Sequence, residues 1–130
     1  MASIFTRIIN GEIPCYKVAE NGRFFAFLDI SPLKAGHTLI VPKKEIDYLF
    51  DLEDNDLEGI MVFSKKVAAA IKKAYPCNRI GVAVLGLEVP HAHIHLVPMD
   101  NMEDVNFKNP KLKFSPEEFR EIAANISKNL

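Results

Sequence analysis

Three of the four histidines in this chain stand at every second position of one short segment, as His91, His93 and His95. In a β-strand, successive side chains point to opposite faces, so this spacing predicts three imidazoles on one face with hydrocarbon behind them. On a helix, the same spacing would scatter the three rings, and the prolines that flank the segment also disfavour a helix. We therefore predict a strand over residues 90–98.

Three imidazoles on one face admit three interpretations. They can form a hydrogen-bonded structural face without a chemical role. They can bind a metal, because two histidines in a His-x-His pair on a strand can present their nitrogens to zinc. They can also act on phosphate, with one imidazole as the nucleophile and its neighbours as hydrogen-bond donors. The rest of the chain has to distinguish these uses.

The composition predicts one folded domain over residues 1–130. Hydrophobic residues make up 48% of the 130, which is enough for a core. The formal net charge is −1 and no run of Lys and Arg is interleaved with aromatics, so neither nucleic acid nor an anionic membrane is an expected partner. No apolar run approaches the roughly 20 residues of a membrane helix, and no secretion signal begins the sequence. We expect a cytoplasmic protein.

The two cysteines, Cys15 and Cys77, lie far apart in the sequence and lack CxxC spacing. A disulfide framework or a four-cysteine zinc site needs more cysteines at closer spacing. The pattern therefore predicts reduced, structural thiols.

Capping residues and helical periodicity predict three helices. Ser3 is a good N-cap for a short first helix, which the Asn-Gly pair at 10–11 would end. Apolar residues keep a helical period over residues 54–75, with acidic residues at the start and lysines in the second half, as the helix dipole favours. A Ser-x-x-Glu capping box that begins at Ser115 predicts a terminal helix over residues 116–129.

Turn residues and β-branched runs predict the strands. The Asn-Gly pair at 21–22 is typical of a two-residue hairpin turn between antiparallel strands at 16–20 and 23–29. Residues 37–42, which begin with the fourth histidine, and residues 79–86 predict two more strands. The link from the latter to the histidine strand is too short for a crossover helix, so those two strands should be antiparallel neighbours. The elements predict an α+β domain: a five-stranded, mainly antiparallel sheet with one long helix and short terminal helices.

The histidine segment, residues 91–97, resembles the alternating motif of the histidine triad (HIT) family of nucleotide hydrolases and transferases. Three upstream segments resemble other blocks of that family, in order and at similar separations: residues 3–9, 26–32 and 36–44. The resemblance covers residues 3–98 and leaves a C-terminal tail and helix at 99–130. The branch it most resembles hydrolyses nucleoside phosphoramidates, and its members are typically homodimers with the two sheets joined edge to edge. A homodimer is therefore expected.

The resemblance implies a hydrolase that acts on purine nucleotides without a metal or a cofactor. His93 would attack the α-phosphorus and expel an amine or other leaving group, after which water would release AMP or GMP. His91 would orient His93, because a nucleophilic imidazole must keep its attacking nitrogen unprotonated. His95 and His37 would donate to the non-bridging phosphate oxygens.

The resemblance also implies a nucleoside site. Asp29 matches the acidic residue that receives the ribose hydroxyls, for which a carboxylate is a suitable acceptor, and a turn residue at the strand end is its alternative interpretation. Seven apolar residues match the base pocket, with core packing as the alternative for each: Ile4, Phe5, Ile8, Ile13, Phe27, Ile30 and Leu39.

The chain departs from the family near the triad. The loop before the histidines is cut to residues 85–88, and Glu88 replaces a hydroxyl residue that faces the leaving group. We predict that Glu88 lies at the mouth of the site and favours cationic amine leaving groups; a solvated turn residue is the alternative. Ser3 and Thr6 stand where some bacterial relatives bind zinc through CxxC, and Glu45 where a histidine often follows two lysines, which predicts no zinc.

Two functions of other classes stay open. A metal hydrolase built on the three histidines would want a further carboxylate base and an open coordination position. A regulatory module would bind nucleotide with little turnover. Within the resembling family, a dinucleoside polyphosphate hydrolase is the alternative to a phosphoramidate hydrolase.

Overall fold

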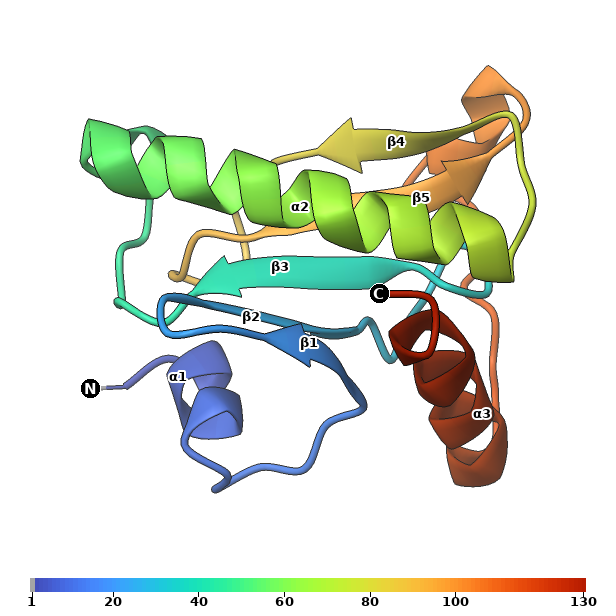
Figure 1. Ribbon diagram of the computed structural model, residues 1–130, viewed down its shortest axis with the longest axis horizontal. Helices are drawn as coiled ribbons and strands as arrows, with labels where there is room; N and C mark the ends of the chain where they lie inside the picture. The colour runs from blue at the N-terminus through green and yellow to red at the C-terminus, as the bar shows by residue number, and fades with distance from the viewer. Residues whose placement is uncertain (1) are drawn as a thin grey trace.

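The computed structural model describes residues 2–130. Its centre is a sheet with strand order β1-β2-β3-β5-β4, in which all neighbouring strands are antiparallel (Figure 1). The strands are β1 (Lys17–Glu20), β2 (Phe24–Leu28), β3 (Thr38–Pro42), β4 (Arg79–Ala83) and β5 (Ile94–Met99). The helices are α1 (Ile4–Ile9), α2 (Asp54–Ala74) and α3 (Pro116–Ser127), with short 3-10 helices η1 (Leu49–Asp51) and η2 (Met102–Val105).

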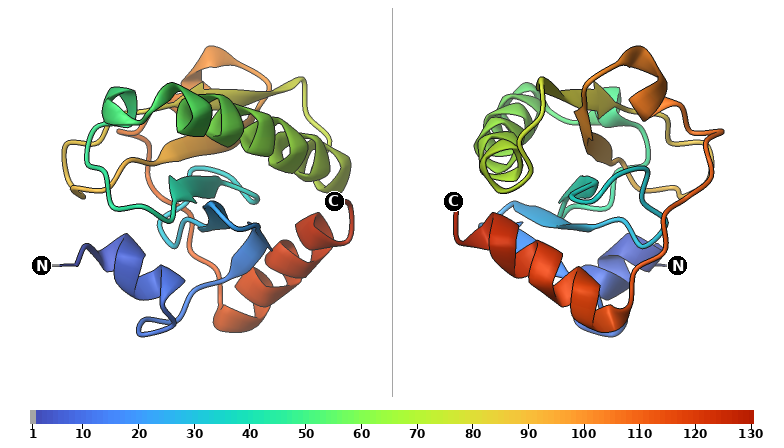
Figure 2. Two further views of the ribbon diagram at one scale, coloured as in Figure 1. Left: turned by 60° about the vertical axis from the view of Figure 1, so that its left-hand side comes forward. Right: turned by 90° about the vertical axis from the view of Figure 1, so that its right-hand side faces the viewer.

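The two faces of the sheet pack against different elements. Helices α2 and α3 cover one face, where Ile40 and Ile94 of adjacent strands belong to the larger core together with Ile60 of α2 (Figure 2). Helix α1 packs on the other face, where Phe5 joins an apolar cluster that includes Leu39. Because strands β2 and β3 are buried on both faces, their sequences are continuous apolar runs instead of alternating ones.

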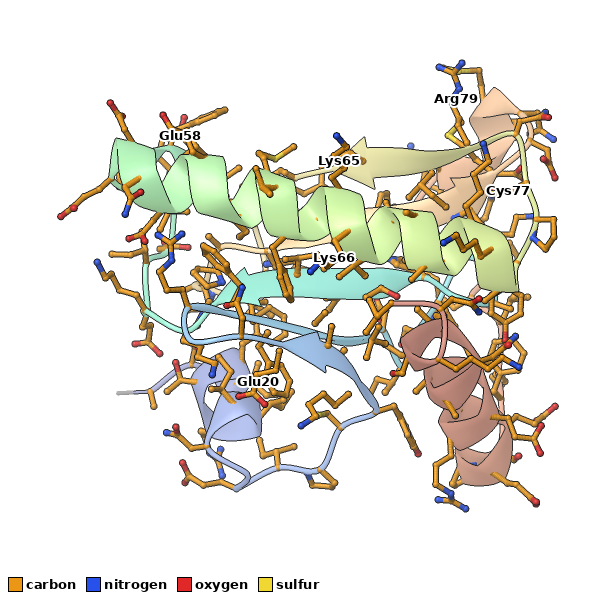
Figure 3. All side chains as sticks on the ribbon, viewed as in Figure 1. Glu20, Glu58, Lys65, Lys66, Cys77 and Arg79 are labelled. Atoms are coloured by element: carbon orange, nitrogen blue, oxygen red, sulfur yellow. The ribbon has the colours of Figure 1, made fainter. Side chains whose placement is uncertain are left out.

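The predicted α+β architecture and its five-stranded antiparallel sheet are confirmed. The caps are confirmed as well: the Ser3 side chain accepts from the backbone of Thr6, and Ser115 and Glu118 form a capping box. The charged side chains of α2 that Figure 3 labels, Glu58, Lys65 and Lys66, are exposed.

Two further observations concern the described chain as a whole. Both cysteines, Cys15 and Cys77, are free and half-buried. Among residues 2–130, none of the helices combines the length and the apolar character that crossing a membrane requires.

The predicted histidine strand is wrong at its start. Strand β5 begins at Ile94, so His95 alone of the three histidines lies in a strand, and His91 and His93 lie in the loop before it. The pairing of β3 with β5 stops at Ile40 and Ile94. In a continued register Pro42 would face the loop, but proline has no N–H to donate, and its carbonyl accepts from the His91 side chain instead.

Candidate active site

His91 is completely buried where the loop before β5 meets the end of β3 and the start of α1. Its Nε2 lies 2.8 Å from the carbonyl oxygen of Pro42. A carbonyl can only accept, so the ring proton sits on Nε2. Nδ1 is then an acceptor, and the hydroxyl of Ser3 donates to it at 2.7 Å. These two partners hold a neutral His91 in a single tautomer.

The main chain of His91 fixes the ring of His93. Nδ1 of His93 lies 2.7 Å from the carbonyl oxygen of His91, so Nδ1 carries the proton and donates. When the ring is neutral, its lone pair is therefore on Nε2. The ring of Phe5 packs edge-on against His93, with centroids 5.0 Å apart, and limits its rotation. An unprotonated nitrogen with a fixed direction is what a nucleophilic imidazole requires.

His37 and His95 form a second chain of hydrogen bonds with one direction. The backbone N–H of Leu33 donates to Nδ1 of His37 at 3.0 Å, so the proton of His37 is on Nε2. That Nε2–H donates to Nδ1 of His95 at 2.9 Å. His95 then keeps its own proton on Nε2, which can donate to a substrate oxygen. The two rings of His93 and His95 are neighbours, with centroids 5.1 Å apart.

His37 is more deeply buried than His95. Its side chain is 1% exposed and both of its nitrogens have partners, whereas His95 is 8% exposed. The resemblance implied a direct hydrogen bond from His37 to phosphate. In this arrangement, the Nε2–H of His37 is donated to Nδ1 of His95.

Burial keeps the rings of His37, His91 and His95 neutral near pH 7. Loss of solvent lowers the pKa of His95 to about 4 and that of His37 to about 3, with the neighbouring histidine as a further cause in each case. Burial also lowers the pKa of His91. Neutral rings agree with the hydrogen-bond directions, because each of these three histidines uses one nitrogen as an acceptor.

We expect the free energy of unfolding to fall as the pH is lowered from 7 to 5. In the unfolded chain a histidine takes up a proton near pH 6.5, whereas His37 and His95 stay neutral in the folded chain down to about pH 3 and 4. Between these values the unfolded state binds more protons, so acid favours it, by up to about 1.4 kcal/mol per pH unit for each histidine. Urea unfolding at several pH values measures this slope. A His37→Gln variant should have a smaller slope, and an equal slope would contradict the assignment.

Asp29 follows β2 and uses its two oxygens differently. Oδ1 accepts the backbone N–H of Ser31 at 2.8 Å, which is the turn geometry, while Oδ2 lies 3.5 Å from Nε2 of His37. Burial raises the pKa of this carboxyl. Asp29 is thus both a turn residue and a carboxylate at the histidines.

Two metal sites can be compared with this geometry. Both nitrogens of His91 have partners, so His91 cannot join His93 and His95 as a ligand without breaking them. Asp29, His37 and His95 do offer ligand atoms within 4.8 Å of one another. A metal there would have to displace the proton that His37 donates to His95. A metal at either place would therefore have to break hydrogen bonds that the structure contains.

The apolar residues expected around a base divide into two groups. Phe5, Phe27 and Leu39 are buried in one cluster beside His93, and Ile8 packs against it. The others lie further toward the surface: Ile4 and Ile30 are exposed, and Ile13 is half-buried. Glu88 is exposed in the loop that precedes the histidines, and it forms no ion pair within residues 2–130.

Sequence reasoning missed Phe107, which lies in the tail after η2. Its ring packs edge-on against His95, with centroids 4.8 Å apart, and also approaches His37 at 6.2 Å. The backbone N–H of Leu112 donates to the Pro32 carbonyl at 2.9 Å and holds this tail beside the loop that carries Leu33. A lone aromatic residue in a polar segment was the only signal, and it does not reveal which residue the ring will meet.

The chain is similar to known proteins over most of its length. A family model described as the HIT domain matches residues 10–102. The chain is 36% identical over 135 residues to an uncharacterized HIT-like protein of Borreliella burgdorferi, which covers 98% of this chain and 97% of that one. It is 34% identical over 132 residues to adenosine 5'-monophosphoramidase of Schizosaccharomyces pombe, with coverage of 100% and 99%. The crystal structure of a HIT-like protein from Bartonella henselae has a TM-score of 0.85 at 32% identity, with coverage of 98% and 96%.

Proposed function

Because this chain belongs to the histidine triad (HIT) family, we propose that it hydrolyses purine nucleoside 5'-phosphoramidates or related substrates at the α-phosphorus and releases AMP or GMP. The observation that carries the proposal is the tautomer of His93. Its Nδ1–H is bound to the His91 carbonyl, which leaves the lone pair on Nε2 for attack. The name of the Schizosaccharomyces pombe relative supports the choice of a phosphoramidate as substrate.

The reaction has two steps. In the first, the Nε2 lone pair of His93 forms a bond to phosphorus while the bond from phosphorus to the amine breaks, and the amine leaves with that electron pair and takes up a proton from the solvent. His93 keeps its Nδ1–H, whose positive charge the His91 carbonyl stabilises. His95 donates from Nε2 to a non-bridging oxygen as charge develops. In the second step, water attacks phosphorus and gives up a proton to the solvent while the bond to His93 breaks and its electron pair returns to Nε2, which regenerates the neutral ring.

Nucleoside binding is assigned to the groups beside His93. Asp29 would accept the ribose hydroxyls, chiefly through Oδ2, since Oδ1 is bound to Ser31. Phe5, Phe27 and Leu39 offer an apolar wall for the base. We also propose a cytoplasmic location, which rests on the sequence alone.

A substrate panel tests this proposal. Purine phosphoramidates, thiophosphates and dinucleoside polyphosphates are assayed for release of the monophosphate, with and without a chelator. We expect phosphoramidates to turn over fastest and the rate to resist the chelator. Absence of turnover with every substrate would instead support a nucleotide-binding module, and loss of activity with the chelator would support a metal hydrolase.

Glu88 is expected to set a preference for cationic leaving groups. A carboxylate at the mouth of the site attracts a positive amine, and a charge at about 4 Å contributes a few kcal/mol near a protein surface. Glu88→Gln should reduce the ratio of kcat/KM for a cationic over a neutral amine by about tenfold, or about 1.4 kcal/mol, with the neutral substrate little changed. An unchanged ratio would leave Glu88 as a solvated turn residue.

A two-fold homodimer is expected through β4 and α2. β4 is the last strand at one edge of the sheet, where an open strand must be covered or paired (Figure 1). Apolar side chains are exposed on or directly after these two elements: Met61 and Val62 on α2, Val82 on β4, and Val84 just after β4. Sedimentation at micromolar concentration should give the mass of a dimer, and Val82→Glu that of a monomer. Phe50→Glu, an exposed apolar position on η1, is the control and should stay dimeric. A monomeric parent protein would contradict the prediction.

A further inference from the structure

Three polar residues from distant parts of the chain meet at the ring of His91. Ser3 and Thr6 stand at the start of α1, and Glu45 lies in the loop after β3. Oε1 of Glu45 accepts the backbone N–H of Ser3 at 2.5 Å and the hydroxyl of Thr6 at 2.7 Å. These positions match those where histidine triad relatives bind zinc or often carry a histidine. In this structure they form a hydrogen-bonded cluster with His91.

The cluster directs the hydroxyl proton of Ser3 toward His91. Ser3 Oγ accepts the backbone N–H of Thr6 at 3.1 Å, which leaves its own proton for Nδ1 of His91 at 2.7 Å. The Thr6 hydroxyl also lies within 3.4 Å of this Nδ1. A carboxylate can only accept hydrogen bonds, so the Thr6 hydroxyl donates to Glu45. Ser3 is then the hydroxyl that donates to the imidazole of His91. The same two donors hold the pKa of Glu45 low, at about 2, so it is ionised at neutral pH.

Hydrogen bonds connect this cluster through His91 to His93, the proposed nucleophile. With Nδ1 of His91 occupied by a donor, its proton must be on Nε2 and bound to the Pro42 carbonyl. The backbone of this loop is tied on the same side, because Ala92 donates to the carbonyl of Ile46, the neighbour of Glu45, at 2.7 Å. The His91 carbonyl that these contacts hold is the acceptor for Nδ1 of His93.

We propose that Ser3, Thr6 and Glu45 are positioning residues that hold His91, and through its carbonyl the ring of His93, in the orientation for attack. An N-cap alone does not explain the arrangement. Capping α1 requires only that Ser3 accept from Thr6, whereas Ser3 also donates to a fully buried imidazole 88 positions away. The expected effect on kcat rests on the proposed function. The expected tautomer of His91 rests on the hydrogen-bond geometry alone.

Ser3→Ala removes the donor to His91 and is the main test. We expect kcat to fall by about tenfold with KM little changed, because binding groups stay in place while the attacking ring is misdirected. Nitrogen-15 NMR of the histidine rings should report protonated Nε2 and unprotonated Nδ1 at His91 in the parent, and a mixture of tautomers in the variant. Ser3→Thr keeps a hydroxyl and should restore both properties.

Two further variants keep the test decisive. Ser115→Ala removes the matching N-cap from α3, which packs on the face of the sheet opposite α1, and should change neither kcat nor the His91 signals. Glu45→Gln alters an exposed residue and should lower kcat and shift the same signals, even if Ser3→Ala fails to fold. Parent values of kcat and of the His91 signals in the folded variants would overturn the inference. A parent protein without turnover would refute the proposed function instead, and the NMR signals would still decide the role of the cluster at His91.

Discussion

His93→Ala should lower kcat for phosphoramidate hydrolysis by at least about a thousandfold, the scale on which removing a catalytic nucleophile acts in other hydrolases. The variant removes the one nitrogen whose lone pair the hydrogen bonds of the site leave for attack. Because Asp29 and the apolar cluster around Phe5 remain, we expect it to bind nucleoside monophosphate with nearly the parent affinity.

Controls separate lost chemistry from lost structure. His93 is packed against Phe5, so alanine leaves a space, and His93→Asn fills part of it with a side chain that cannot act as an imidazole nucleophile. Both variants should be equally inactive and should bind AMP in calorimetry. Parent-like turnover by either one would contradict the role of His93.

The second large effect is expected at His95. The hydrogen bonds from Leu33 to His37 and from His37 to His95 leave the Nε2–H of His95 to donate to the substrate. Removing one such donor typically costs about a hundredfold to a thousandfold in kcat, so His95→Ala should lose activity on that scale. Steady-state kinetics with one phosphoramidate measures it, and a loss of less than about threefold would exclude a role in charge stabilisation.

A double-mutant cycle tests the place of His37. Because Nε2 of His37 donates to His95 at 2.9 Å and lies further, at 3.5 Å, from Oδ2 of Asp29, His37 should act chiefly through His95. His37→Ala should therefore cost less than His95→Ala, and the double variant should be no worse than His95→Ala alone. Effects that multiply would show that His37 also acts apart from His95, either through Asp29 or by contacting the substrate as the sequence resemblance implied.

Much of the fold could be predicted because its signals are local. Caps such as Ser3 and Ser115 act within a few residues. The hairpin of β1 and β2 is confirmed, but its predicted turn is wrong: neither Asn21 nor Gly22 has a positive φ, and the Asn21 side chain instead accepts the backbone N–H groups of Arg23 and Phe24. The start of β5 could not be predicted in this way. It depends on Pro42, which is distant in sequence and cannot extend the ladder with the loop before Ile94.

The candidate site divides in the same way. The spacing of the histidines brought His91, His93 and His95 to attention, but the positions of their protons depend on main-chain groups: the Pro42 and His91 carbonyls and the Leu33 amide. Every residue has such groups, so no side-chain pattern reveals which of them will be used. Phe107 and Glu45 reach the histidines through tertiary contacts, and these become visible only in the folded chain.

Rapid-quench trapping can show directly whether turnover passes through a nucleotidyl group on His93. The enzyme is mixed with a radiolabelled purine nucleoside phosphoramidate, quenched within one turnover under conditions that preserve phosphorus-nitrogen bonds, digested and mapped by mass spectrometry. A nucleotidyl group should be found on the peptide that contains His93, attached to that residue and absent from His93→Asn. Label on another residue, or turnover without any trapped label on the protein, would contradict this prediction.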